Sequence, residues 1–123
     1  MPFDPRLRVL VVGAGGRDHA LASAFSRSPR LAELHAAPGN AGIARLGTCH
    51  TDVPLDDTEG LLALAARIRP DLVVIGPEDL LVAGLATRFE AAGFPCVGPS
   101  VGAARLEGSK VFAKQLMERA GIA

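Results

Sequence analysis

The sequence has no excess of charge of either sign, because 13 lysine and arginine residues are balanced by 13 aspartate and glutamate residues among its 123. A protein that gathers a phosphate polymer or an anionic membrane presents a broad cationic field, which this balance does not supply. We therefore expect neither nucleic acid nor a membrane as a partner.

The sequence also lacks a targeting segment and a cysteine motif. Met1 is followed by no basic segment leading into an apolar run, and no apolar run approaches the length that spans a bilayer. We therefore expect a cytoplasmic protein. The two cysteines, Cys49 and Cys96, are far apart, lack C-x-x-C spacing and lie in apolar, strand-like stretches. We interpret both as reduced core thiols rather than disulfide partners or metal ligands.

The apolar content of 49% in 123 residues is enough for one core and too little for two ordinary domains. Short apolar runs without alternation are typical of strands covered on both faces of a parallel sheet. Between them, apolar residues recur at helical spacing. Strand and helix alternate, which predicts a doubly wound α/β domain. The expected strands are Leu7 to Val12, Leu34 to Ala37, Leu72 to Ile75 and Pro95 to Val97, with a polar alternative within Gly47 to Val53, and the expected helices cover Ala20 to Phe25, Leu61 to Ile68, Leu81 to Ala92 and Lys110 to Ala120.

Two helix boundaries carry sequence signals. Asp56 followed three residues later by Glu59 has the spacing of a capping box. We therefore interpret the acidic run that also includes Asp57 as a cap rather than a metal site. Gly93 directly follows Ala92 and suits the left-handed position that ends a helix.

Glycine-bearing turns follow the ends of the predicted strands. In an open parallel sheet, ligands bind beyond the carboxyl ends of the strands, because helix amino termini with free amide donors converge there. Any one such turn is also compatible with a purely structural role, but together they predict a single binding crevice. The turns are Gly13 to His19, Pro38 to Gly42, Gly76 to Glu78 and Gly98 to Ser100.

The first turn resembles a dinucleotide-binding fingerprint but lacks its two diagnostic features. The fingerprint has glycine or alanine at the sixth position, where this chain has Asp18, and an acidic residue at the end of the second strand, where it has Ala37 and Pro38. The turn remains suited to an anionic group, because glycine permits close approach and the following helix presents its positive end. Arg17 either adds a charge-assisted hydrogen bond or is an exposed first-turn arginine.

Asn40 and Glu78 are the polar side chains that the predicted topology places best for contact with a ligand in the crevice. Asn40 lies in a glycine-rich turn, where asparagine often bonds only its own turn. Glu78 stands at a helix start, where it either caps the helix or accepts hydrogen bonds from sugar hydroxyls. We interpret His19 as a packing or capping histidine, and His35 and His50 show no partner pattern. No nucleophile, metal cluster or catalytic carboxylate pair is recognisable.

Five segments together resemble the phosphoribosylamine–glycine ligase family of the ATP-grasp superfamily. They are VLVVGAGGRDHALA at 9–22, PGNAGIA at 38–44, DLVVIGPEDLLVAG at 71–84, VGPS at 97–100 and LEGSKVFAKQLM at 106–117. The resemblance covers nearly the whole chain in order and is much more specific than any single motif. It implies that 5-phosphoribosylamine, glycine and ATP give glycinamide ribonucleotide, ADP and phosphate through a glycyl phosphate intermediate, in purine biosynthesis.

The resemblance also implies a division of the chain. Residues 1–108 would form an amino-terminal, Rossmann-like domain that binds phosphoribosylamine, and 109–123 the first helix leading into an ATP-grasp domain. The lysine that matches Lys110 contacts ATP phosphate in similar enzymes, whereas magnesium or manganese and most of ATP would be bound beyond Ala123. We therefore expect a truncated fragment that is inactive alone, from a longer monomeric enzyme. The candidate substrate-binding residues are Gly13, Gly15, Gly16, Arg17, Pro38, Gly39, Asn40, Gly76, Glu78 and Ser100.

Three residues depart from the family pattern: Asp18 where glutamate is common, Ile43 where threonine is common and Leu80 where proline is common. Asp18 keeps the charge with a shorter reach. Ile43 removes a hydroxyl, which puts any contact of that side chain in doubt, and Leu80 changes only the start of a helix.

Alternatives to the ligase interpretation stay open. A dinucleotide-binding domain of an oxidoreductase or redox sensor is disfavoured by the end of the second strand. A non-catalytic nucleotide-sensing or protein-interaction module with the same fold would lack a following ATP-grasp domain. A related carboxylase or formyltransferase is disfavoured by the PGNAG and GGRDHA motifs.

Overall fold

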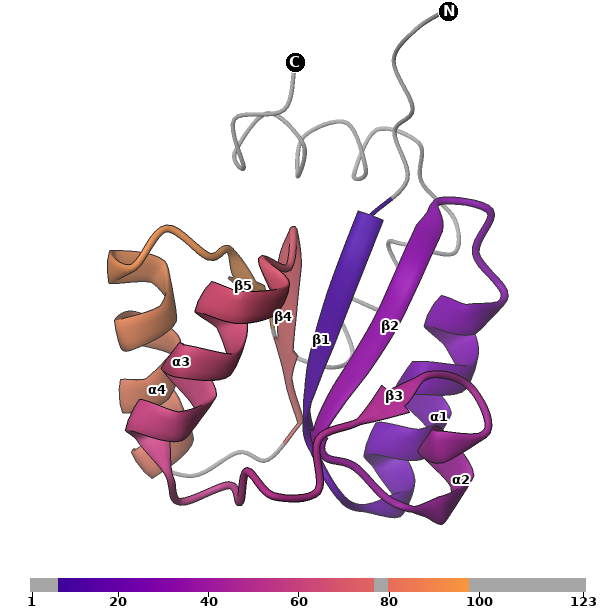
Figure 1. The fold of residues 1–123 in the computed structure, drawn as a ribbon, viewed down its shortest axis with the longest axis horizontal. Coiled ribbons are helices and arrows are strands. Elements are labelled where there is room, and N and C mark those ends of the chain that lie inside the picture. The colour runs from indigo at the N-terminus through magenta and orange to yellow at the C-terminus, as the bar shows by residue number, and fades with distance from the viewer. Residues whose placement is uncertain (1–6, 77–79, 98–123) are drawn as a thin grey trace, which may run out of the picture.

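Strands and helices alternate throughout the computed structural model, which describes residues 7–76 and 80–97. Figure 1 shows the strands as one sheet between two pairs of helices. In chain order the elements are β1 (Leu7–Gly13), α1 (Gly16–Ser26), β2 (Leu31–Pro38), α2 (Ala41–Ala44), β3 (Thr48–Cys49), α3 (Thr58–Ile68), β4 (Leu72–Ile75), α4 (Leu80–Ala91) and β5 (Cys96–Val97).

The sheet has the order β3-β2-β1-β4-β5, and every neighbouring pair is parallel. The chain runs outward from β1 through β2 to β3, then returns past β1 to β4 and β5, so its direction of travel reverses beside β1. The prediction of a doubly wound parallel sheet is confirmed. The polar segment from Gly47 to Val53 contains the short strand β3.

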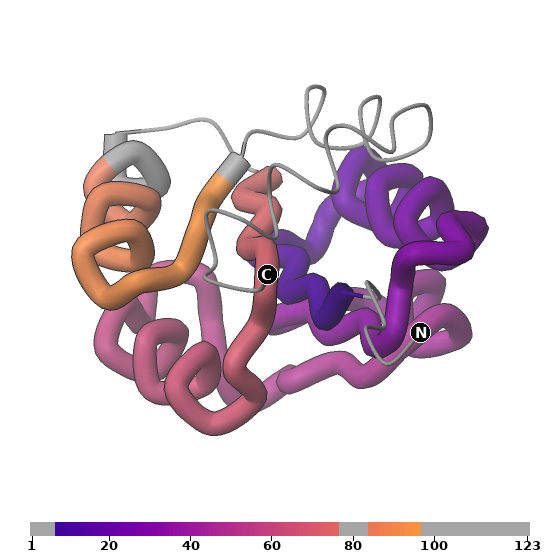
Figure 2. Tube along the Cα trace, turned by 90° about the horizontal axis from the view of Figure 1, so that it is seen from above, coloured from indigo at the N-terminus to yellow at the C-terminus, as the bar shows by residue number. Residues whose placement is uncertain are grey.

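The helices cover opposite faces of the sheet. α1 and α2 lie on one side, and α3 and α4 on the other (Figure 1). Seen from above, the purple α1 and the orange α4 lie apart with the strands between them (Figure 2). This arrangement follows from right-handed crossovers on either side of the reversal, which place the helices on different faces.

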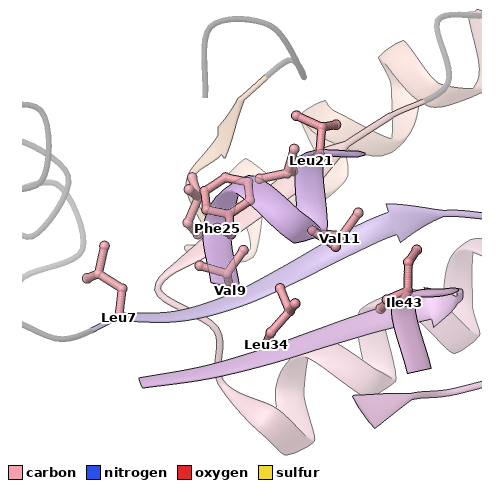
Figure 3. Packing of buried hydrophobic residues seen from close by; sticks show 11 residues of the cluster. Leu7, Val9, Val11, Leu21, Phe25, Leu34 and Ile43 are labelled. Atoms are coloured by element: carbon pink, nitrogen blue, oxygen red, sulfur yellow. The ribbon is translucent and has the colours of Figure 1, made fainter. Parts of the chain in front are cut away.

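The core consists of two apolar layers, one on each face of the sheet. Successive side chains of a strand point to opposite faces. Val9 and Val11 pack with Leu21 and Phe25 of α1, as Figure 3 shows, whereas Leu10 lies in the layer beneath α3 and α4. All three β1 side chains are fully buried. This explains why β1 is apolar without alternation.

The amino terminus of α3 corrects the predicted cap by one residue. Asp57, not Asp56, is the capping residue, and its Oδ1 accepts a hydrogen bond from Gly60 N at 2.9 Å. Glu59 does not complete a capping box, because it lies two residues after Asp57 rather than three. Its carboxylate instead pairs with Arg88 of α4 at 2.6 Å. Aspartate is a favourable capping residue, so the sequence alone does not decide between Asp56 and Asp57. In the fold, Asp57 caps α3 and Glu59 is used for the contact with α4.

The end of α4 agrees with the sequence. Gly93 has a φ of +95°, and Phe94 N donates to Phe89 O at 2.9 Å, which closes the last turn in the manner of a left-handed helix terminus. The predicted helix from Lys110 to Ala120 lies outside the described residues. Within 7–76 and 80–97, no helix is both long enough and apolar enough to cross a membrane.

Candidate functional site

Three of the four predicted turns begin at the same level of the sheet. In the strand register Gly13 stands opposite Pro38, and Val12 opposite Ile75. Backbone hydrogen bonds continue this alignment one residue further: Gly39 N donates to Gly13 O at 3.0 Å, and Gly76 N to Val12 O at 3.0 Å. The carboxyl ends of β1, β2 and β4 thus form one edge, at which α1 begins.

Asn40 joins the second turn to the first. Its Nδ2 donates to Ala14 O at 3.0 Å and to Gly15 O at 3.2 Å, while its Oδ1 accepts from Ile43 N at 3.0 Å and caps α2. Both atoms of the side-chain amide are therefore engaged within the protein. The structure gives Asn40 a part in fixing the two turns relative to each other.

The second turn is also held from β3. Gly39 has a φ of +76°, and a Cβ atom there would lie closer than 3.0 Å to Cys49 Sγ. The Cys49 thiol donates to Asn40 O at 3.6 Å. Cys49 and Cys96 are both free thiols, as expected, and Cys49 acts as a packing group under the turn.

Asp18 is a buried residue of this edge whose role the sequence interpretation missed. Its side chain is only 5% exposed, and its Oδ2 accepts from Gly15 N at 2.9 Å. The sequence identifies Asp18 only as a mismatch to the dinucleotide-binding fingerprint and as a departure from the family pattern. The available signal was its place three residues after Gly15, where a first-turn carboxylate commonly satisfies a free amide at the helix start.

The remaining predicted residues divide into those the structure places and those it does not describe. Gly15, Gly16 and Arg17 are exposed at the start of α1. His19 packs its ring over α2, where a Cβ atom on Gly42 would lie 2.7 Å from His19 Cε1, in agreement with the packing interpretation. The described residues contain no group of three or more histidine, cysteine, aspartate or glutamate side chains that could hold a metal ion. Glu78, Ser100 and Lys110 lie outside the described residues.

His35 and His50, which show no partner pattern in the sequence, contact each other in the fold. His35 Nδ1 lies 3.0 Å from His50 Nε2, and His35 Nε2 lies 2.9 Å from Glu33 Oε1. Glu33 also contacts Arg8, with 3.2 Å between Nε and Oε1. Alternation along β2 places Glu33 and His35 on one face, and the pairing of β2 with β3 brings His50 to them. This chain of polar groups runs from β1 across β2 to the residue that follows β3, and does not include the three glycine-bearing turns.

These contacts shift the pKa values of two groups in the cluster, His50 and Glu33. Burial, with the charges of His35 and Arg67, lowers the pKa of His50 against the opposing effect of Asp52. The hydrogen bond from His35, aided by Arg8, lowers the pKa of Glu33 against the effect of desolvation.

The lowered pKa of His50 predicts a loss of stability in mild acid. The unfolded chain takes up the proton near pH 6.5, before the folded chain does, so stability falls as the pH decreases from about 6.5 to the folded value. The Glu33 contribution is present above about pH 4.5 and is lost as the pH falls through its folded value. Thermal unfolding across this pH range should show a shallower decline below pH 6.5 in His50→Gln. If Tm depended on pH identically in the unmodified chain and in His50→Gln, the assignment of this loss of stability to His50 would be contradicted.

The chain folds as a doubly wound α/β domain, a class of fold in which ligands bind beyond the carboxyl ends of the parallel strands. Residues 7–107 match the family described as "Phosphoribosylglycinamide synthetase, N domain". The chain belongs to this family, which confirms the resemblance.

Curated relatives named phosphoribosylamine–glycine ligase cover nearly all of the chain. The protein of Mycobacterium leprae is 53% identical over 94% of this chain and 27% of its own length. That of Streptomyces coelicolor is 51% identical over 94% of this chain and 28% of its own length. A solved structure of the Thermotoga maritima phosphoribosylamine–glycine ligase is 37% identical, with a TM-score of 0.48, over 93% of this chain and 25% of that one. The chain thus spans about a quarter of the length of the relatives it matches.

Proposed function

We propose that this chain is the amino-terminal domain of a phosphoribosylamine–glycine ligase and that its crevice binds 5-phosphoribosylamine. The family match over residues 7–107 supports the first part. The observation that carries the second is the alignment of three glycine-bearing turns at one sheet edge, the first two of which are joined by Asn40. Such an edge offers backbone amides and a helix amino terminus to a phosphorylated sugar.

The crevice contributes binding and orientation rather than chemistry. Gly15 N is engaged by Asp18, so the amides offered to a ligand begin in the first turn of α1, at Gly16 and Arg17. We propose that these amides and the Pro38 to Asn40 turn hold parts of the sugar phosphate and that Glu78 accepts hydrogen bonds from ribose hydroxyls. Ser100 belongs to the fourth predicted turn and completes the proposed site.

ATP and its metal are proposed to bind mainly outside this domain. The described residues offer no carboxylate cluster suited to magnesium or manganese, and of this chain only Lys110 is proposed to reach ATP phosphate. The longer enzyme would join glycine to phosphoribosylamine with conversion of ATP to ADP and phosphate. We also propose that it is a cytoplasmic monomer, and size-exclusion chromatography with light scattering tests the oligomeric state.

A binding experiment tests the proposed site on the chain itself. Ribose 5-phosphate, a stable probe that carries the sugar and the phosphate, should shift the amide resonances of Gly16, Arg17, Gly39 and Gly76 in a saturable way. NAD, NADP and FAD should cause no specific shift, because the ribose-reading acid is absent. Ile68 and Arg69, at the carboxyl end of α3 and beside Arg8 at the opposite end of β1, serve as the internal control. Micromolar affinity for a dinucleotide would overturn the proposal in favour of the oxidoreductase alternative.

A further inference from the structure

Asp18 is the one charged side chain that is buried in the described part of the chain. Only one of its two oxygens has a partner: Oδ2 accepts from Gly15 N at 2.9 Å, whereas Oδ1 is buried without a hydrogen bond. A buried polar atom without a partner is costly. An alanine at this position would avoid that cost, so packing alone does not account for the carboxylate.

The carboxylate occupies space that two glycines leave open. A Cβ atom on Gly13 or on Gly76 would lie closer than 3.0 Å to carboxyl atoms of Asp18, whereas one on Gly15 would lie 3.5 Å away, at ordinary contact distance. Asp18 therefore touches the main chain at the last residue of β1 and at the residue that follows β4. The absence of side chains at Gly13 and Gly76 is what admits it.

These contacts connect all three described turns through Gly15. Its amide donates to Asp18 Oδ2, and its carbonyl accepts from Asn40 Nδ2. Asp18 links the first turn to Gly76, and Asn40 links the first turn to the second. One buried carboxylate and one amide side chain thus add to the backbone hydrogen bonds from Gly39 N and Gly76 N that align this edge.

We propose that Asp18 is the positioning residue of the crevice. Its carboxylate sets the spacing between the first turn and Gly76, and so fixes where the backbone amides of these turns meet the sugar phosphate. This inference rests on the proposed function, because it assigns Asp18 to the same binding site. Asp18 acts through the turns and is not itself assigned a contact with the ligand.

The contact between Asp18 and Gly76 is tested by a double-mutant cycle in this chain. Gly76→Ala should lower Tm by roughly 5 °C or more, because the new methyl group displaces the carboxylate. In the Asp18→Ala background the same substitution should cost much less, since the obstructing group is gone. Gly84→Ala is the matched control, because a Cβ atom at Gly84 meets nothing within 4 Å. Equal losses from Gly76→Ala in both backgrounds would overturn the contact, and Asp18→Ser replaces Asp18→Ala if the latter does not fold.

The positioning role is tested in a ligase that carries this domain. Asp18→Ala should raise the KM for phosphoribosylamine about tenfold and change kcat and the KM for ATP and glycine less than twofold. Asp18→Asn, which keeps an acceptor for Gly15 N, should recover most of the loss. A lowered Tm with an unchanged KM for phosphoribosylamine would overturn the positioning role.

The two proposals fail in different ways. If ribose 5-phosphate does not bind to the unmodified chain, the proposed function fails, and the Asp18–Gly76 coupling in Tm remains measurable without ligand. If ribose 5-phosphate binds equally well to the unmodified chain and to a folded Asp18→Ala chain, the positioning role alone is overturned.

Discussion

In a ligase that carries this domain, Glu78→Gln is expected to raise the KM for phosphoribosylamine roughly tenfold to a hundredfold. The substitution keeps the shape of the side chain but exchanges a charged acceptor for a neutral one, and hydrogen bonds to a charged group contribute about 1.5–3 kcal/mol. The KM values for ATP and glycine should stay nearly unchanged, because we propose that their sites lie mainly outside this domain. Steady-state kinetics with each substrate varied in turn measures the effect.

A matched substitution separates binding from helix capping. Glu90→Gln makes the same chemical change at an exposed glutamate near the carboxyl end of α4 and should leave all three constants unaltered. If Glu78 only caps a helix, Glu78→Gln should lower thermal stability slightly and change the three constants little or equally. An unchanged phosphoribosylamine constant in well-folded Glu78→Gln would remove this residue from the site.

Gly39→Ala is expected to lower the free energy of unfolding by roughly 2–4 kcal/mol. Part of the loss is backbone strain, because Gly39 has a φ of +76°, where a left-handed conformation costs about 1–2 kcal/mol for a residue with a Cβ atom. The rest is overpacking, because the new Cβ atom would lie closer than 3.0 Å to Cys49 Sγ. Urea unfolding of the chain measures the total.

Gly93→Ala isolates the backbone contribution. Gly93 also has a positive φ, of 95°, but a Cβ atom there meets nothing within 4 Å. Gly93→Ala should therefore lower the free energy of unfolding by less than Gly39→Ala does. The difference is the cost of the overpacking against Cys49. Cys49→Ala should reduce the penalty of Gly39→Ala and leave that of Gly93→Ala unchanged. Equal losses at the two glycines would show that the Cys49 contact contributes nothing.

The fold was predictable because its signals are local. β4 was predicted with its observed bounds, Leu72–Ile75, since a fully buried parallel strand is continuously apolar and stops at glycine. The start of β2 was predicted three residues too late, at Leu34 instead of Leu31. Ala32 and Glu33 are exposed near the outer side of the sheet, so this part of β2 carries no apolar run. Its strand conformation comes from pairing with β1, which the sequence of β2 alone does not contain.

The candidate site was predictable as a set of turns but not as a set of contacts. The glycine turns followed from where the strands end. Asp18 was misjudged because its burial depends on Gly13 and Gly76, which belong to different turns and meet it only in the folded sheet. The contact between His35 and His50 could not be predicted for the same reason. The pairing of β2 with β3, not a spacing in the sequence, brings the two rings together.

Because β3 is only two residues long, part of the edge of β2 is available for pairing with a strand of another molecule. β3 pairs only with His35 and Ala36, so among the described residues no strand lies on the outer side of residues 31–34 of β2. Glu33 lies in that open stretch with its side chain half exposed and engaged with Arg8 and His35. A foreign strand that extended the sheet there would have to strip water from this carboxylate. Charged side chains on an exposed edge strand oppose such pairing. Glu33, which contacts His35, is therefore expected also to oppose edge-to-edge aggregation at this part of the sheet.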